Sequence, residues 1–213
     1  MQKVVIFDFD GTVADDEDFL HKIYIKIAKE KNWKPLNREQ YRKLFTANVW
    51  QAMIWSRFRP WRLYYLVRQS RLGMRENKEK IILFDGMSRL ILDLKKDGFD
   101  IYILSRNWQS TIQAIVDHNE LSSSLVVLEK PGFFSKHKSI KKLIKKRGYL
   151  KKNVWMIGDE VRDIYAAEKS GVNSIAVTWG FQDESMLLTQ NPSEIAHSIK
   201  DIESVLNQGI IAT

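Results

Sequence analysis

The feature that most constrains the fold is the start of the sequence, where a short apolar run ends in two closely spaced acids. Residues 3–7 (Lys-Val-Val-Ile-Phe) hold four consecutive apolar residues, which is typical of a strand buried on both faces in a parallel sheet. Asp8 and Asp10 follow at once, and Gly11 allows the backbone to turn sharply. Because open α/β folds bind ligands at the carboxyl ends of their strands, the acids predict a ligand site there.

Two other interpretations of this turn have to be considered. Asp and Gly are ordinary turn formers that hydrogen-bond their own backbone, and in that interpretation the segment is only structural. An EF-hand calcium loop needs Gly at its sixth position and Glu at its twelfth. Counted from Asp8, Gly11 stands fourth and Phe19 stands twelfth, so the calcium loop is excluded.

Length and composition limit the class of protein. A chain of 213 residues is long enough for one α/β domain with a good core and a smaller appendage. The sequence has no cysteine, which excludes a disulfide framework and a thiolate zinc site, and its four histidines show no metal-binding spacing. The first seven residues are too short an apolar stretch for a signal peptide, and no segment approaches the roughly 18 apolar residues of a membrane span. We therefore expect a soluble, cytoplasmic protein.

Residues 15–84 carry helical patterns and no strand signal. The acids of residues 15–18 begin the first helix, where they favour the helix dipole, and Pro35 ends it. We expect further helices up to residue 80, broken at Pro60 and Gly73. The middle of the segment is rich in aromatic residues and arginines: Trp50, Trp55, Phe58, Trp61, Tyr64 and Tyr65 among Arg57, Arg59, Arg62, Arg68 and Arg71.

From Asp85 onward, helical and strand patterns alternate. The expected helices cover residues 87–96, 109–116, 139–146 and 162–170, the expected strands cover 99–104, 125–128, 154–157 and 174–179, and Pro192-Ser193 opens a last amphipathic helix. This alternation predicts an α/β fold with a doubly wound, mostly parallel sheet and helices on both of its faces.

Polar groups follow two more of the expected strands. The strand at 99–104 leads into Ser105-Arg106-Asn107, and the strand at 154–157 leads into the segment from Gly158 to Asp163. Since the carboxyl ends of parallel strands share one edge, we expect five side chains to converge although they are far apart in the sequence: Asp8, Asp10, Ser105, Asp159 and Asp163.

These motifs resemble those of the haloacid dehalogenase superfamily of Mg²⁺-dependent phosphohydrolases. The matches occur in order: DxDGT at residues 8–12, a serine at Ser105, a lysine in the basic segment 136–138, and GDxxxD at residues 158–163. The segments FDGM, KSGVNSIAVTWGF and NPSEI look like the phosphoglycolate phosphatase-like branch. The resemblance covers about residues 1–14 and 85–213, and it implies a Rossmann-like phosphatase core in those residues. It also implies that residues 15–84 form an inserted helical cap of the C1 type, a lid over the phosphate site.

The resemblance also implies a mechanism with roles for individual residues. Asp8 is the expected nucleophile, which forms an aspartyl phosphate, and Asp10 protonates the leaving alcohol and later deprotonates the hydrolytic water. Mg²⁺ is expected on Asp8, Asp159 and the backbone carbonyl of Asp10. Ser105 and a lysine bind the transferring phosphoryl group. A second group of side chains supports these residues: Thr12, Asn107, Lys138, Glu160 and Asp163.

The residue types fit this chemistry independently of the resemblance. A phosphomonoester dianion repels a carboxylate nucleophile, so a divalent cation has to bridge the two, and hard Mg²⁺ prefers carboxylate oxygens.

Asp10 favours phosphoryl chemistry over dehalogenation, because dehalogenases of this superfamily lack an acid at that position. Phosphomutases share both aspartates, so a mutase stays an alternative.

Two lysines compete for the phosphate-binding role. Residues 136–152 hold nine Lys or Arg and no acid, and most of these charges belong to a solvated helical face. Only a lysine near the helix start reaches the site, which leaves Lys136 and Lys138. We prefer Lys136, because it precedes Asp159 by 23 positions, as in related phosphatases without insertions.

The net charge of +8 bears on substrates and partners. Residues 53–80 hold eight Arg or Lys and two Glu, so we expect the cap to attract an anionic group beyond the transferred phosphate, through Arg57, Arg59 and Arg62. The expected substrate is a small phosphorylated metabolite. The alternative is a basic binding or scaffold protein with a vestigial site, or a phosphatase of nucleic-acid ends. Nothing in the sequence indicates an oligomeric state.

Overall fold

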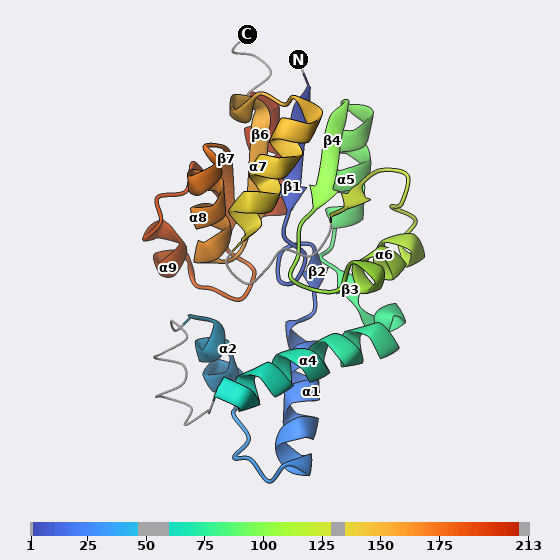
Figure 1. The fold of residues 1–213 in the computed structure, drawn as a ribbon, viewed down its shortest axis with the longest axis vertical. Coiled ribbons are helices and arrows are strands. Elements are labelled where there is room, and N and C mark those ends of the chain that lie inside the picture. The colour runs from blue at the N-terminus through green and yellow to red at the C-terminus, as the bar shows by residue number, and fades with distance from the viewer. Residues whose placement is uncertain (1, 47–59, 129–134, 209–213) are drawn as a thin grey trace.

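The sheet is built around β1 (Lys3–Phe7), the apolar run near the start of the chain. The computed structural model describes residues 2–46, 60–128 and 135–208. In it, the strands stand in the order β5 (Val126–Val127), β4 (Phe99–Ile103), β1, β6 (Val154–Gly158), β7 (Asn173–Val177) and β8 (Glu194–Ala196). All neighbouring strands pair in parallel, so their carboxyl ends share one edge (Figure 1).

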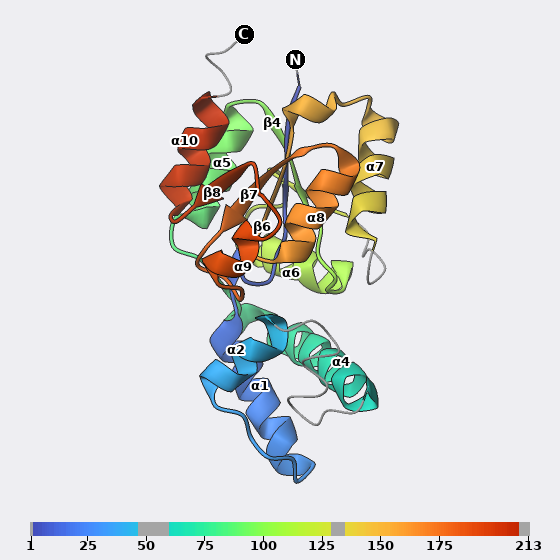
Figure 2. The same cartoon turned by 90° about the vertical axis from the view of Figure 1, so that its left-hand side faces the viewer.

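The two faces of the sheet are covered by different helices. Val5 and Phe7 of β1 belong to one core cluster, and Val4 and Ile6 belong to the other, because successive side chains of a strand point to opposite faces. The helices on the first face are α5 (Met87–Lys96), α6 (Gln109–His118) and α10 (Ile199–Gln208), and those on the second are α7 (Lys136–Arg147) and α8 (Val161–Ser170) (Figures 1 and 2). The predicted doubly wound parallel sheet is confirmed.

Three further helices lie beyond the carboxyl edge of the sheet (Figures 1 and 2). We call α1 (Glu17–Glu30), α2 (Arg38–Thr46) and α4 (Pro60–Glu76) the helical part. Two short antiparallel strands, β2 (Ala14–Asp15) and β3 (Ile82–Leu83), join it to the rest of the chain, and a 3₁₀ turn, η1 (Lys78–Lys80), precedes β3. This pairing lies where the predicted boundaries of the cap fall, and the division into core and cap stays a prediction.

The expected helix break at Gly73 is wrong. Helix α4 continues through this position and ends at Glu76. A Cβ atom on Gly73 would lie 2.4 Å from Cδ1 of Ile23, and α1 and α4 pack against each other. Gly73 therefore allows close approach of two helices instead of ending one.

The prediction that Pro192-Ser193 opens the last helix is also wrong. The segment forms strand β8, which adds Ile195 to the edge of the sheet, and the helix begins only at Ile199. A strand of three residues (Glu194–Ala196) is too short for its periodicity to separate strand from helix. The short helix α9 (Glu184–Leu188) and the 3₁₀ turn η2 (Lys151–Asn153) were not predicted, because neither has a clear pattern in the sequence.

The aromatic residues of the helical part have mixed environments. Trp33 is buried and packs edge-on against Tyr65, with ring centroids 6.2 Å apart. Trp61 and Tyr64 are exposed. Trp50, Trp55 and Phe58 lie outside the described residues. No helix in the described part of the chain is long and apolar enough to cross a membrane.

Adjacent residues of α5 provide a test of the core. Ile91 is fully buried, whereas Leu92 is 40% exposed. We expect Ile91→Ala to lower the free energy of unfolding by about 2–5 kcal/mol, because it leaves a cavity, and Leu92→Ala to change it by no more than about 0.5 kcal/mol. Urea unfolding followed by circular dichroism measures both, and equal losses would contradict the difference in packing between the two residues.

Candidate active site

Asp8 stands at the carboxyl end of β1, between the neighbouring strands. Its backbone N–H donates to the carbonyl oxygen of Ile157 (2.8 Å), and the N–H of Leu104 donates to the carbonyl oxygen of Phe7 (2.8 Å). The side chain is also fixed, because Oδ1 accepts a hydrogen bond from the N–H of Phe9 (2.7 Å). The carboxylate is therefore held by the sheet itself.

Lys136 connects Asp8 to a second carboxylate. Its Nζ lies 2.6 Å from Oδ2 of Asp8 and 2.5 Å from Oδ1 of Asp163, and all three side chains are buried. Lys136 is the first residue of α7, so the helix begins at the site, three residues before the predicted start. Lys138 is exposed. Of the two lysines considered from the sequence, the structure places Lys136 against the acids.

Asp10 lies in a different polar environment. Its Oδ1 accepts from Nδ2 of Asn107 (2.9 Å), and its Oδ2 accepts from Oγ of Ser105 (3.2 Å). The Oγ of Ser105 in turn accepts from the backbone N–H of Asn107 (2.9 Å). The turn after β4 therefore orients Asp10, and in this arrangement the Ser105 hydroxyl serves the acid.

The two aspartates have opposite pKa shifts. Burial acts to raise the pKa of Asp8, but the nearby charges of Lys136 and Arg162 and the hydrogen bond from Lys136 hold it below its ordinary value. Burial raises the pKa of Asp10, and the negative charge of Asp8 raises it further. Asp8 is thus kept ionised, whereas Asp10 holds a proton more firmly than a free carboxyl group does.

Asp16 is a buried acid that the sequence analysis did not single out. It was one of four acids at a helix start, and nothing in the sequence distinguished it from the other three. In the structure its side chain is fully buried, and Oδ1 accepts from the N–H of Gly11 (3.2 Å). Burial raises its pKa well above the ordinary value, and the charge of Asp10 adds to this effect.

Asp159 is enclosed by the turn after β1 and the loop after β7. Its Oδ1 accepts from Oγ1 of Thr12 (2.7 Å), and its Oδ2 accepts from the N–H of Phe181 (2.8 Å). A Cβ atom on Gly180 would lie 2.3 Å from this side chain, so only glycine fits there. Burial raises the pKa of Asp159 to about 7, and the charges of Asp8 and Asp163 contribute.

The acids form a group with the character of a cation site. Oxygens of Asp8, Glu160 and Asp163 lie within 4.8 Å of one another, and all three residues are buried. Asp163 caps α8 by accepting from the N–H of Glu160 (3.3 Å), and burial raises its pKa to about 6. Lys136 and Arg162 offset part of this negative charge, and three carboxylates this close form a donor set that fits a hard divalent ion. Asp159 lies beside this group, and its role as a metal ligand stays a prediction.

Two arginines near the acids, Arg106 and Arg162, have no predicted role. Arg106 follows Ser105, and Arg162 lies within the segment from Gly158 to Asp163. Arg162 forms an ion pair with Glu160, and its Nε–H is buried without a hydrogen-bond partner in the described residues. Arg106 is half-buried. Burial lowers the pKa of Arg106, while the charges of Asp8, Asp163 and Asp10 oppose this shift. Positive charge therefore surrounds the carboxylates.

The arginines predicted to select the substrate are described only in part. The guanidinium carbon of Arg62 lies 5.0 Å from the ring centroid of Trp33 and 5.4 Å from that of Trp61, so it stacks between aromatic rings. Arg57 and Arg59 lie outside the described residues. The role of all three in substrate selection stays a prediction.

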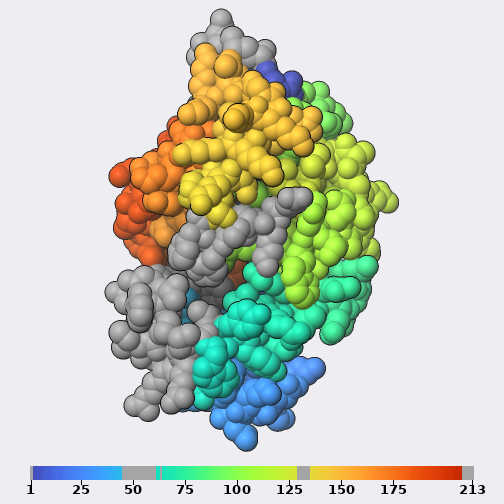
Figure 3. All heavy atoms as spheres, viewed as in Figure 1, coloured from blue at the N-terminus to red at the C-terminus, as the bar shows by residue number. Residues whose placement is uncertain are grey.

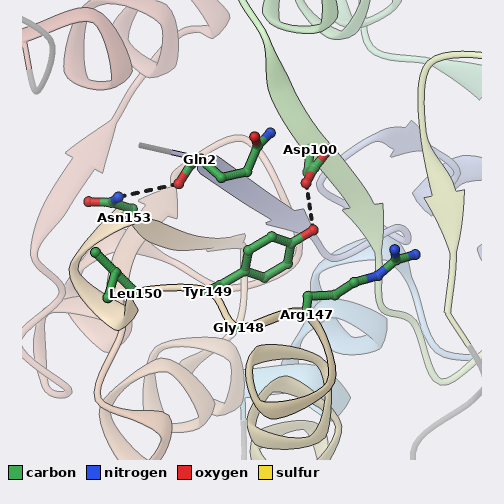
Figure 4. A pocket seen from close by; sticks show the side chains of 7 residues that line it. All are labelled: Gln2, Asp100, Arg147, Gly148, Tyr149, Leu150 and Asn153. Carbon is green, nitrogen blue, oxygen red and sulfur yellow. Dashed lines mark hydrogen bonds between the residues drawn. The ribbon is translucent and has the colours of Figure 1, made fainter.

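A separate cavity of about 340 Å³ opens at the opposite edge of the sheet (Figure 4). The hydroxyl of Tyr149 donates to Oδ2 of Asp100 there (2.5 Å) and lies 2.7 Å from the hydroxyl of Tyr102. Burial and these contacts raise the pKa of Tyr149, so it stays protonated. This cavity lacks the group of acids, and we assign it no chemistry.

Comparison with known proteins agrees with this geometry. Residues 5–177 match the family model described as haloacid dehalogenase-like hydrolase. A phosphoglycolate phosphatase from Synechococcus elongatus is 26% identical over 97% of this chain and 98% of its own length. The pyrophosphatase PpaX from Oceanobacillus iheyensis is 21% identical over 96% of each chain. The crystal structure of a predicted phosphatase from Clostridium acetobutylicum has the same fold, with a TM-score of 0.81 at 19% identity over 98% of this chain and 99% of its own.

The chain belongs to the haloacid dehalogenase-like hydrolase family. Within that family it is a phosphatase of the phosphoglycolate phosphatase-like branch. The resemblance found in the sequence motifs is thereby confirmed.

The first prediction from the site separates the two lysines. We expect Lys136→Ala to lower kcat by on the order of a hundredfold or more, because it removes the ammonium beside Asp8. Lys138→Ala, which removes an exposed charge from the same helix, is the matched control and should change kcat little. Steady-state hydrolysis of an aryl phosphate measures both, and the reverse result would assign the role to Lys138.

The second prediction concerns pH and divalent cations. A carboxyl group whose pKa is raised by folding stabilises the fold below its ordinary value of 3.8, and this contribution is lost as pH rises through about 7, as for Asp159. EDTA-treated protein should therefore have a lower Tm at pH 8 than at pH 5. Mg²⁺ should raise the Tm more at pH 8 than at pH 5, because it binds the ionised carboxylates.

Differential scanning fluorimetry checks this expectation. Asp159→Asn is the informative variant, because it removes one of the buried charges and should reduce the difference that Mg²⁺ makes at pH 8. A Tm that does not respond to Mg²⁺ at pH 8 would argue against a cation site among these acids.

Proposed function

We propose that this phosphatase hydrolyses a small phosphorylated metabolite in a Mg²⁺-dependent reaction through an aspartyl phosphate on Asp8. The observation that carries the proposal is the contrast between Asp8 and Asp10, two carboxyl groups in one site whose surroundings move their pKa values apart. Such a contrast is how enzymes assign different roles to two acids. The carboxylate with the lowered pKa is suited to attack, and the carboxyl group with the raised pKa is suited to hold and donate a proton.

The proposed reaction uses these two carboxyl groups in turn. The Asp8 carboxylate attacks phosphorus and displaces the alkoxide, which takes the proton held by Asp10. Asp10, now ionised, accepts a proton from the water that attacks the aspartyl phosphate, and inorganic phosphate leaves. Ser105 and Asn107 keep the Asp10 carboxyl group in place through their hydrogen bonds. The Lys136 ammonium neutralises charge on the phosphoryl oxygens.

A divalent cation completes the charge balance of this site. We propose that Mg²⁺ is held by Asp8 and Asp159, with the Asp10 carbonyl as a further ligand, and that Glu160 and Asp163 lie close to it. When bound, the ion offsets the repulsion between the substrate dianion and the carboxylates. The gathering of three buried carboxylates at one point supports a cation of this kind.

The substrate class rests on the relatives and on the helical part. The similar proteins include, by name, a phosphoglycolate phosphatase, pyrophosphatases and a 5'-nucleotidase, and these names denote small substrates. We propose that residues 15–84 form the cap and that α4 covers the site. A cover of this kind leaves room for a compact substrate and excludes bulk water.

Substitution of Asp8 tests the proposed function. Asp8→Asn should abolish turnover of an aryl phosphate while leaving the circular dichroism spectrum unchanged, because the amide cannot act as the nucleophile. Asp10→Asn should slow the reaction strongly but still accept a beryllium fluoride adduct on Asp8, detectable by ¹⁹F NMR. Turnover by Asp8→Asn, or an adduct on Asp10, would contradict the roles of the two aspartates, and wild-type activity that survives EDTA would contradict the metal.

A further inference from the structure

Helix α2 of the helical part lies against the loop that follows β7 (Figure 2). Nη2 of Arg42 donates to the carbonyl oxygen of Gly180 there (3.2 Å). A separate contact is made by α4, where Sδ of Met74 lies 3.0 Å from Nδ2 of Asn107, and Figure 3 shows the α4 region in close contact with the residues around α6. The contact of Arg42 reaches a loop that also serves the candidate active site.

The peptide group that Arg42 contacts carries a second hydrogen bond, to Asp159. The carbonyl of Gly180 and the N–H of Phe181 belong to one planar unit. This N–H donates to Oδ2 of Asp159 (2.8 Å). Since the carbonyl and the N–H of a trans peptide point in opposite directions, Arg42 and Asp159 lie on opposite sides of the unit. A rotation of the peptide plane would break both hydrogen bonds together.

Gly180 makes the backbone at this peptide group easy to rotate. A Cβ atom at this position would lie 2.3 Å from Asp159, so the close approach of the loop to the acid requires glycine. Glycine also adopts a wider range of backbone angles than any other residue. The same residue therefore allows the contact and softens the backbone that makes it. The hydrogen bond from Arg42, which comes from outside the loop, restrains the peptide plane.

Arg42 is itself held by a buried acid, Glu17, the first residue of α1. Nε of Arg42 lies 3.0 Å from Oε1 and 2.9 Å from Oε2 of Glu17, and Nη2 lies 2.8 Å from Oε2. Pairing of both carboxylate oxygens with one planar guanidinium group fixes the orientation of that group. The remaining N–H of Nη2 is thereby directed at the carbonyl oxygen of Gly180.

Charges and dipoles alternate in sign from Glu17 to Asp159. The Glu17 carboxylate faces the Arg42 guanidinium, the guanidinium faces the carbonyl of the peptide group, and the N–H of that group faces the Asp159 carboxylate. Hydrogen bonds in such a chain polarise one another and become stronger. The positive charge on the carbonyl side therefore makes the N–H of Phe181 a better donor to Asp159.

We propose that Arg42 is a positioning residue for Asp159 and acts through the peptide group between Gly180 and Phe181. The inference rests on the proposed function, in which Asp159 is a ligand of Mg²⁺. With Oδ2 held by Phe181 and Oδ1 held by Thr12 (2.7 Å), the carboxylate keeps one orientation. Loss of a partner that orients a metal ligand weakens metal binding by about 10- to 100-fold. A residue of the helical part thus tunes the cation affinity of the site.

Two arginines that share one acidic partner provide the variants and their control. Arg42→Gln removes the charged donor to Gly180, and the milder Arg42→Lys keeps the charge but lacks the planar fork. Arg38→Gln is the control, because Arg38 pairs with Glu17 (3.2 Å) and with Asp18 (2.8 Å), both in α1. An effect that came only from weaker pairing between α1 and α2 would appear in the control as well.

The amide proton of Phe181 reports on the peptide group directly. Hydrogen exchange followed by NMR on EDTA-treated protein measures its protection without metal or turnover. We expect Arg42→Gln to speed its exchange by on the order of tenfold, Arg42→Lys to speed it less, and Arg38→Gln to leave it near the wild-type rate. An unchanged rate in both Arg42 variants, or an equal increase in the control, would overturn the proposal.

The affinity for Mg²⁺ tests the consequence for the site. The Mg²⁺ dissociation constant follows from the dependence of the Tm on Mg²⁺ concentration at pH 8. We expect Arg42→Gln to raise this constant by on the order of tenfold and Arg38→Gln to leave it unchanged. Asp159→Asn is measured beside them, because it removes the charge of the carboxylate that Arg42 is proposed to position.

The two measurements separate this inference from the proposed function. If Arg42→Gln speeds the exchange of Phe181, but neither Arg42→Gln nor Asp159→Asn changes the Mg²⁺ dissociation constant, then Asp159 is not a ligand. That part of the proposed function then fails while the positioning of Asp159 by Arg42 stands. If Asp159→Asn weakens Mg²⁺ binding and Arg42→Gln leaves it unchanged, the inference fails alone.

Discussion

The arrangement of the active site depends on one buried ammonium group, that of Lys136, held between the carboxylates of Asp8 and Asp163. A buried charge is tolerated when it is paired, and the removal of one partner leaves the others uncompensated. These three residues belong to the end of β1, the start of α7 and the first turn of α8. The contact therefore fixes two helices of one face to the central strand, and it keeps the Asp8 carboxylate ionised in an environment that otherwise favours its protonated form.

The same site concentrates more negative charge than this lysine offsets. Asp159 and Asp163 have raised pKa values because burial and neighbouring acids oppose their ionisation. The apolar packing of the strands offsets this repulsion, since Val5, Phe7 and Ile157 are fully inaccessible to solvent. A rigid sheet thus holds carboxylates closer together than they would lie in water, and such a group of oxygen ligands fits a divalent cation.

Hydrophobic patterns were enough to predict the sheet, because strands buried on both faces have continuous apolar runs, as in residues 3–7 and 154–157. The polar residues at the strand ends followed from the expected topology, and the spacing of 23 positions to Asp159 made Lys136 the better candidate. The errors arose where tertiary contacts override local signals. Gly73 packs against Ile23 instead of ending a helix, and β8 is a strand because it pairs with β7. Asp16 could not be singled out from the sequence, since its significance comes from its complete burial beside Asp10 in the folded chain.

The helical part and the chemistry are coupled through Asp10. Asp16 precedes α1 directly and lies beside Asp10, Met74 of α4 contacts Asn107, and Arg42 of α2 donates to the carbonyl oxygen of Gly180 (3.2 Å) next to the loop around Asp159. Burial is the largest cause of the raised pKa of Asp10. If α1 and α4 moved away, water would reach the Asp10 carboxyl group and return its pKa toward the ordinary value. In the proposed reaction, the helical part would therefore help Asp10 to hold the proton that the leaving group needs.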